Sequence, residues 1–371
     1  MSTAARVVLG ALTGALALSV TACGSKDEAP KAERRAKSGT GDTAPAAVAV
    51  DASGLRTKAA AFFSSPPAEA SPKAYAMSDA LVNLGRTLYY DKRLSKNHDV
   101  SCNSCHDLAN YGVDGEPTSP GHKGQRGDRN SPTVYNAAFH ITQFWDGRAA
   151  DVEAQAKGPV LNPIEMAMPS EEVVVATLGS IPGYQEMFKA AFPDSGITYD
   201  NMATAIGAFE RRLVTPSAFD KFLAGDDKAL DDKALRGLQA FLDTGCTQCH
   251  TGPALGGTMY QKLGAVKPYD TKDVGRFALT KNEADRHVFK VPSLRNVAKT
   301  GPWMHDGSIA DLGQMVEIMA KHQTTKGSLS TDEKTQLLAF LDSLTGELPA
   351  DYIKAPALPE SGPETPKPDP T

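Results

Sequence analysis

Two copies of Cys-x-x-Cys-His have the clearest chemistry in this chain of 371 residues. The residues concerned are Cys102, Cys105 and His106 in the first copy and Cys246, Cys249 and His250 in the second. At this spacing two thiols can add across the vinyl groups of one haem while the adjacent histidine reaches its iron. Each copy therefore predicts a covalent c-type haem site. A structural zinc site or a thioredoxin-like redox pair is the alternative, but neither requires a histidine directly after the second cysteine.

The two motifs lie in stretches of the chain that repeat one pattern. Setting Pro132 against Pro292 without gaps pairs asparagine with asparagine, Asp-Gly with Asp-Gly and aspartate with aspartate. The matched pairs are Asn136 and Asn296, Asp146 and Asp306, Gly147 and Gly307, and Asp151 and Asp311. This internal duplication predicts that each stretch folds around its own haem in the same way.

Helical patterns surround the motifs, and strand patterns are sparse. Apolar residues recur at helical spacing over 78–94, 199–213 and 232–242, and Ser330 with Glu333 forms a capping box for a helix that reaches Leu344. We therefore expect a mainly α fold with two cytochrome c-like domains in tandem, long loops and little sheet. We expect the N-terminal domain over 61–215 and the C-terminal domain over 216–347, and we call these ranges the first and second halves.

The two halves differ at the positions that could supply the sixth ligand of each haem iron. Met315 and Met319 lie one turn apart on a helix expected after Gly307, and either thioether could face the second haem. In the first half, Pro159 occupies the position that matches Met319, so this ligand has no equivalent there. Methionines at helical spacing also fill cores, and the residues alone leave both interpretations open.

His122 is a candidate sixth ligand for the first haem. It lies in the loop 111–130, which contains five glycines and is therefore easily moved, so that a ligand on it could be released. Its place in the chain alone does not raise His122 above the histidines that are expected to be merely solvated, which are His98, His140, His287 and His322.

The N-terminus resembles a bacterial lipoprotein signal. An apolar run over 7–20 follows Arg6 and leads into Val20-Thr21-Ala22-Cys23. The run is shorter than the ~20 apolar residues that a membrane-spanning helix needs, and an ordinary cleaved signal is the alternative. We expect a signal peptide over 1–22, then a lipidated Cys23 and flexible tether over 23–60, which would hold a periplasmic protein at a membrane surface.

The remaining composition limits the choice of partners. Residues 348–371 are rich in proline and predict an extended strap or a loose tail. The net charge is −5 and there is no basic run, which argues against binding to nucleic acid.

Six segments and the spacings between them indicate a family. They are Cys102–His106, Gly121-His122, Asn130-Ser131-Pro132-Thr133, Phe144-Trp145-Asp146-Gly147-Arg148, Pro292-Ser293-Leu294-Arg295-Asn296 and His305. Over about residues 75–350 the chain resembles the bacterial dihaem cytochrome c peroxidase family. The resemblance implies reduction of hydrogen peroxide to water with electrons from a small soluble donor, such as a monohaem cytochrome c or a cupredoxin. It also implies a homodimer.

The resemblance implies roles for single residues. His106 and His250 would be the proximal haem ligands, Met319 the sixth ligand of the C-terminal haem, and His122 a cap on the N-terminal haem in the resting oxidised form. Electrons would enter at the C-terminal haem and pass to the N-terminal haem. His/Met ligation raises the potential of an iron, which suits the second haem to store an electron.

The peroxide pocket and a calcium site are implied in the same way. Trp145 would lie between the haems, and Gln155 and Glu165 would line the pocket. A buried carboxylate with a raised pKa can move a proton between the two oxygens of peroxide, whereas an ordinary surface glutamate is the interpretation without the resemblance. The calcium ligands would be oxygens of three residues, Asn130, Thr300 and Pro302.

Two other functions stay open at this point. A dihaem oxygenase of the methylamine-utilisation type would modify a partner protein, and that relative has tyrosine where Met319 stands here. A dihaem cytochrome that only transfers electrons would keep two six-coordinate irons and would not turn over peroxide.

Overall fold

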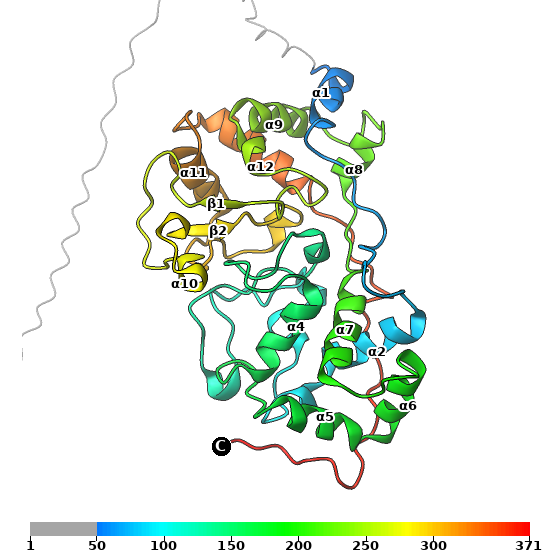
Figure 1. The fold of residues 1–371 in the computed structure, drawn as a ribbon. Helices are drawn as coiled ribbons and strands as arrows, with labels where there is room; N and C mark the ends of the chain where they lie inside the picture. The colour runs from blue at the N-terminus through cyan, green and yellow to red at the C-terminus, as the bar shows by residue number, and fades with distance from the viewer. Residues whose placement is uncertain (1–49) are drawn as a thin grey trace, which may run out of the picture. The chain divides into compact units, whose positions relative to one another are not determined.

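The computed structural model describes residues 50–371, and most of the regular structure is helical (Figure 1). The expected signal peptide, Cys23 and the tether up to residue 49 lie outside the described residues. Within residues 50–371, no helix has the length and apolar character needed to cross a membrane. The expectation of a mainly α chain with little sheet is confirmed.

The helices of the first half enclose one hydrophobic core, which we call the first core. They are α2 (Asp79–Tyr90), α4 (Val152–Leu161), α5 (Glu171–Gly179), α6 (Pro182–Ala191) and α7 (Tyr199–Glu210). Helix α2 packs across α7 at Gly85, where an added Cβ would lie 1.7 Å from the carbonyl oxygen of Ala205. Only glycine permits this approach of the two backbones.

A second core lies among the helices of the second half and the N-terminal helix α1 (Ala52–Ala59). The helices of the second half are α8 (Ala218–Leu223), α9 (Asp232–Asp243), α11 (Leu312–Gln323) and α12 (Thr331–Asp342). Helix α9 packs across α12 at Gly237, where an added Cβ would lie 1.9 Å from the carbonyl oxygen of Gln336. Each haem motif thus follows a helix, α2 or α9, that packs closely across another helix at a glycine.

Short elements fill the loops. The helical turns are α3 (Cys102–Cys105), α10 (Phe277–Thr280) and the 3₁₀ turns η1 (Lys92–Leu94), η2 (Leu108–Asn110), η3 (His122–Gly124), η4 (Ala137–Phe139), η5 (Cys246–Gln248), η6 (Glu283–Asp285) and η7 (Val297–Lys299). Strands β1 (Tyr260–Lys262) and β2 (Val288–Lys290) pair antiparallel, with Tyr260 opposite Lys290.

The backbone repeats the duplication that the sequence predicts. Asn136 and Asn296 both have left-handed φ, at 61° and 60°, and each precedes a 3₁₀ turn. Isolated bridges join Gln143 to Ala149 and, at the matching positions, Trp303 to Ile309. The matched aspartates 151 and 311 are the N-caps of α4 and α11. The gapless alignment therefore describes two copies of one local structure.

Both ends of the described chain pack against the rest of the protein. The flexible tether was expected to reach residue 60, but residues 52–59 form α1, because Leu55, Ala59 and the following Phe63 are buried in the second core. The C-terminal residues form an extended strap over the first half: Tyr352 stacks on Phe209 with ring centroids 5.1 Å apart.

Candidate active site

The first Cys-x-x-Cys-His motif lies on a single helical turn. Helix α3 begins at Cys102 after the N-cap Ser101, and the hydroxyl of Tyr89 on α2 donates a hydrogen bond to the carbonyl oxygen of His106 at 2.8 Å. Cys102 and Cys105 are free thiols, and burial raises the pKa of Cys105 to about 11. Burial also lowers the pKa of His106, so the imidazole is neutral and able to bind a metal ion.

The second motif is held by a backbone contact that orients its histidine. It begins at η5, after Gly245 with a left-handed φ of 86°. The Nδ1 of His250 lies 3.0 Å from the carbonyl oxygen of Leu255, which can only accept, so Nδ1 carries the proton. Burial lowers the pKa of His250 to about 4. The Nε2 of a neutral ring is therefore left as a metal ligand.

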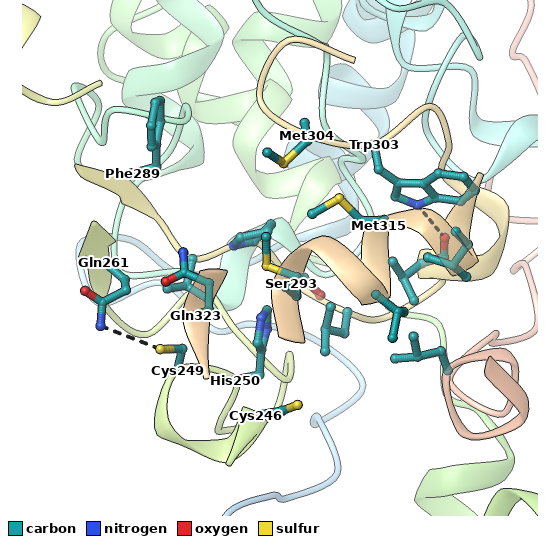
Figure 2. A pocket seen from close by; sticks show the side chains of 18 of the residues that line it. Cys246, Cys249, His250, Gln261, Phe289, Ser293, Trp303, Met304, Met315 and Gln323 are labelled. Atoms are coloured by element: carbon teal, nitrogen blue, oxygen red, sulfur yellow. Dashed lines mark hydrogen bonds between the residues drawn. The ribbon is translucent and has the colours of Figure 1, made fainter. Parts of the chain in front are cut away.

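A mostly apolar cavity of about 240 Å³ lies beside this motif (Figure 2). Cys246, Cys249 and His250 line it, together with Met315 and Met319 from α11. The structure thus brings both predicted methionines to the cavity that holds the histidine. Met304, with a left-handed φ of 76°, is a third methionine on this cavity that the sequence did not suggest.

His122 and Glu165 meet beside the first motif. The backbone N–H of His122 donates to the carbonyl oxygen of Glu165 at 2.8 Å. An added Cβ on Gly121 would lie 2.1 Å from the carbonyl oxygen of Ile164, so glycine is required for the loop to sit this close. The imidazole of His122 is buried, and its Nδ1 has no hydrogen-bond partner in the described part of the chain.

Glu165 has the protonation behaviour expected of an acid–base group. Burial raises the pKa of its carboxyl group, while the nearby Arg148 opposes the shift. Burial is the main cause of the raised pKa of Cys105, and the negative charge of Glu165 also raises it. Glu165 therefore lies near the first haem motif. Gln155 is half-buried on α4, four residues after the N-cap Asp151.

Trp145 links the two halves. Its indole Nε1 donates to the carbonyl oxygen of Asn130 at 2.9 Å, and its ring centroid lies 6.5 Å from that of His305, its partner in the duplication. The backbone N–H of Asn130 donates to the carbonyl oxygen of His305 at 2.9 Å. Trp145, Asn130 and His305 all line the cavity.

The three residues predicted around calcium also lie on this cavity. They are Asn130, Thr300 and Pro302. The Nδ2 of Asn130 donates to the carbonyl oxygens of Glu116 and Pro117 at 3.1 and 3.3 Å, which leaves its Oδ1 as an acceptor. Within residues 50–371, no group of three or more His, Cys, Asp or Glu side chains could hold a metal ion. A cation here would depend on amide and carbonyl oxygens.

Two groups of polar residues near the site were missed from the sequence. Arg129 makes ion pairs with Asp146 and Asp273, both at 2.7 Å. Lys290 is buried on β2 and contacts His140. In the sequence, Lys290 stands out as a lysine inside the apolar run 288–291. The residues next to Arg129 give no indication that it links distant segments.

Comparison with known proteins agrees with this geometry. Residues 79–228 match a family model described as di-haem cytochrome c peroxidase. The chain is 48% identical over 293 residues to a cytochrome c551 peroxidase of Nitrosomonas europaea, covering 78% of this chain and 86% of that protein. The chain belongs to the di-haem cytochrome c peroxidase family. Membership in this family implies haem cofactors.

More distant members of the di-haem cytochrome c peroxidase family are also similar. A methylamine utilization protein MauG of Methylophilus methylotrophus is 33% identical over 313 residues, covering 80% of this chain and 91% of that protein. Among solved structures, a MauG-like protein associated with microbial copper homeostasis aligns with a TM-score of 0.71 at 29% identity, covering 78% of this chain and 97% of that one.

The residues present fit the haems of the di-haem cytochrome c peroxidase family. Each motif offers two free thiols and a half-buried, neutral imidazole. The second motif also opens on an apolar cavity with thioethers on α11, which is the donor set of a His/Met haem.

Proposed function

We propose that this protein is a peroxidase that reduces hydrogen peroxide to water with electrons from a small soluble redox protein. Two cytochrome c-like domains would each hold one haem through thioether bonds, at Cys102 and Cys105 and at Cys246 and Cys249. The relation to a cytochrome c551 peroxidase at 48% identity supports this function more strongly than the relation to MauG at 33%.

The observation that carries the proposal is the difference between α4 and α11. These helices are equivalent in the duplication and both begin after an aspartate N-cap. Helix α11 places Met319 on the cavity of the second motif, whereas the matching residue of α4 is Pro159, which has no ligand atom. One iron site would therefore have a permanent second ligand from its helix, and the other would not.

The first site would be able to expose its iron because its candidate cap, His122, lies on a loop. His122 is held by the turn η3 and by the backbone bond to Glu165. Displacing this short turn breaks few contacts and leaves the proximal His106 in place on α3. When bound, a haem with an open position would supply the iron at which peroxide is cleaved, and the stored electron of the second haem would contribute one of the two electrons required.

Glu165 and Gln155 would act on the peroxide itself. Cleavage to two waters takes two electrons and two protons, so a group must move a proton from one peroxide oxygen to the departing one. Glu165, whose pKa burial raises, can take up and return that proton. Gln155 on α4 would donate a hydrogen bond to hold the peroxide, and Trp145 would connect the two sites.

The remaining assignments are proposed from the sequence and the resemblance. A calcium ion would be held by oxygens of Asn130, Thr300 and Pro302, all of which line the cavity. Lipidation of Cys23 would anchor a periplasmic protein at a membrane surface, and the protein would act as a homodimer.

A spectroscopic redox titration followed by peroxide addition tests the function. We expect two haems with separated potentials, and consumption of hydrogen peroxide by the half-reduced protein. If both irons stay six-coordinate and peroxide is not consumed, the protein is an electron carrier. If peroxide is consumed only together with covalent modification of an added partner protein, and not with oxidation of a small redox donor, the oxygenase function replaces ours.

A further inference from the structure

Lys290 is a buried cation that has no acidic partner among residues 50–371. Its side chain is 5% exposed, it lies on β2, and it lines the apolar cavity beside the second motif. Its Nζ has one hydrogen-bond partner in the described structure, the Nδ1 of His140 at 3.2 Å. Burial lowers the pKa of Lys290 to about 8, and no carboxylate contributes to that pKa. An ammonium ion in this position is costly unless an anion joins it.

His140 adds a second unsatisfied donor. Because its Nδ1 accepts the hydrogen bond from Lys290, its proton is on Nε2. That Nε2 is buried and has no partner among residues 50–371. His140 packs on Gly257, where an added Cβ would lie 2.1 Å from its ring, so the ring is fixed in place. Lys290 and His140 therefore present a positive charge and hydrogen-bond donors at one cavity.

We propose that Lys290, positioned by His140, binds a haem propionate in the cavity of the second motif. The proposal rests on the haem site proposed at Cys246, Cys249 and His250. Propionates lie on the side of the porphyrin away from the vinyl groups, so a haem held by the two cysteines directs its carboxylates away from η5. The apolar cavity lacks other anions, and a carboxylate of the haem supplies the missing charge.

The proposed ion pair between Lys290 and the propionate would affect how readily the second haem stores an electron. A positive charge beside a haem favours its reduced form, so Lys290 raises the potential of the second haem. The backbone N–H of Lys290 also donates to the carbonyl oxygen of Trp145 at 2.8 Å. The propionate site is thereby joined to the residue that links the two halves. Lys290 is a positioning residue that sets the potential of the electron-storing site.

Replacing Lys290 tests the proposal in the haem-loaded protein. Haem content is measured first, because a wild-type protein without two haems would reject the proposed function rather than this inference. In Lys290→Met, we expect two haems and a lower midpoint potential of the second haem. The expected loss is at least tenfold in the equilibrium constant for reduction, about 59 mV for one electron. Lys290→Arg keeps the charge and should retain most of the potential.

Lys262 provides a matched control on the neighbouring strand. It is exposed on β1 and pairs in register with Val288, so Lys262→Met removes the same charge at the surface. An unchanged potential in Lys290→Met, or an equal shift in Lys262→Met, would overturn the proposal. If Lys290→Met loses haem while Lys290→Arg retains it, a charge is required to seat the haem and the proposal stands. Loss of haem in both variants would point to packing and reject it.

Discussion

Asn136 and Asn296, equivalent residues of the duplication, donate hydrogen bonds to the same hydroxyl group. The Nδ2 atom of each lies 2.9 Å from Oγ1 of Thr215. All three residues are buried, and the Oδ1 of Asn136 accepts from the backbone N–H of Thr215 at 3.2 Å. The two halves are therefore joined by one hydroxyl at the point where the chain passes between them.

Removing this hydroxyl should destabilise the whole protein. Thr215→Val keeps the shape of the side chain but leaves two buried amide donors without an acceptor. At roughly 1–3 kcal/mol for each unsatisfied group, the free energy of unfolding should fall by about 2–6 kcal/mol. Urea denaturation measures the change. Thr215→Ser retains the hydroxyl and should lose much less, and equal stability of the Val variant and wild type would contradict the shared role.

Glu165→Gln should leave haem content intact and slow peroxide turnover by about 10²-fold. Burial raises the pKa of Glu165, so its carboxylate form is lost as the pH falls through a value above the ordinary glutamate pKa. The acid limb of the turnover profile should therefore lie above that ordinary value and vanish in the variant. Glu186→Gln, an exposed change on α6, is the control. Equal rates in the Glu165 variant and wild type would remove Glu165 from the mechanism.

Substitution of the methionines on α11 should identify the sixth ligand. Both Met315 and Met319 line the cavity, but we expect only Met319→Leu to abolish the methionine–iron absorption band and lower the potential of the second haem. Met319→His should lower the potential while keeping the iron six-coordinate. Met315→Leu serves as the matched control, and loss of the band in this variant alone would transfer the assignment to Met315.

Trp145→Phe should slow electron transfer between the haems by at least about tenfold, because it removes the indole and its bond to Asn130. The chain offers a matched control in its other tryptophan, Trp303, whose Nε1 donates to the carbonyl oxygen of Val297 at 2.9 Å. Flash photolysis or stopped-flow reduction measures both variants. A larger effect at Trp303 would argue that Trp145 only packs.

Glu210 should make stability depend on pH. It is buried at the end of α7, and burial raises its pKa to about 8, so the folded state holds a proton that the unfolded state releases near pH 4.5. Its contribution is thus complete below about pH 4.5 and is lost progressively as the pH rises to about 8. Glu210→Gln should gain about 1–3 kcal/mol relative to wild type at pH 8.5 and little at pH 5. Thermal melts that fall in parallel for both proteins across this range would reject the prediction.

The sequence by itself determined the features that depend on neighbouring residues. The Cys-x-x-Cys-His spacing, the capping box at Ser330 and the helical periods of α2, α7, α9 and α12 are local, and each is present where predicted. The duplication was also visible, because its matched residues occupy backbone positions with special requirements, such as the left-handed φ of Asn136 and Asn296.

Only the tertiary structure decided which distant residues meet. It placed His122 against Glu165, put α1 into the second core instead of a tether, and left Lys290 buried, with His140 as the one hydrogen-bond partner of its Nζ in the described chain. Burial and charge pairing depend on contacts between segments that are far apart in sequence. Patterns among neighbouring residues do not reveal these contacts. The chemistry of the motifs was therefore encoded by spacing, while the environment that tunes it came from packing.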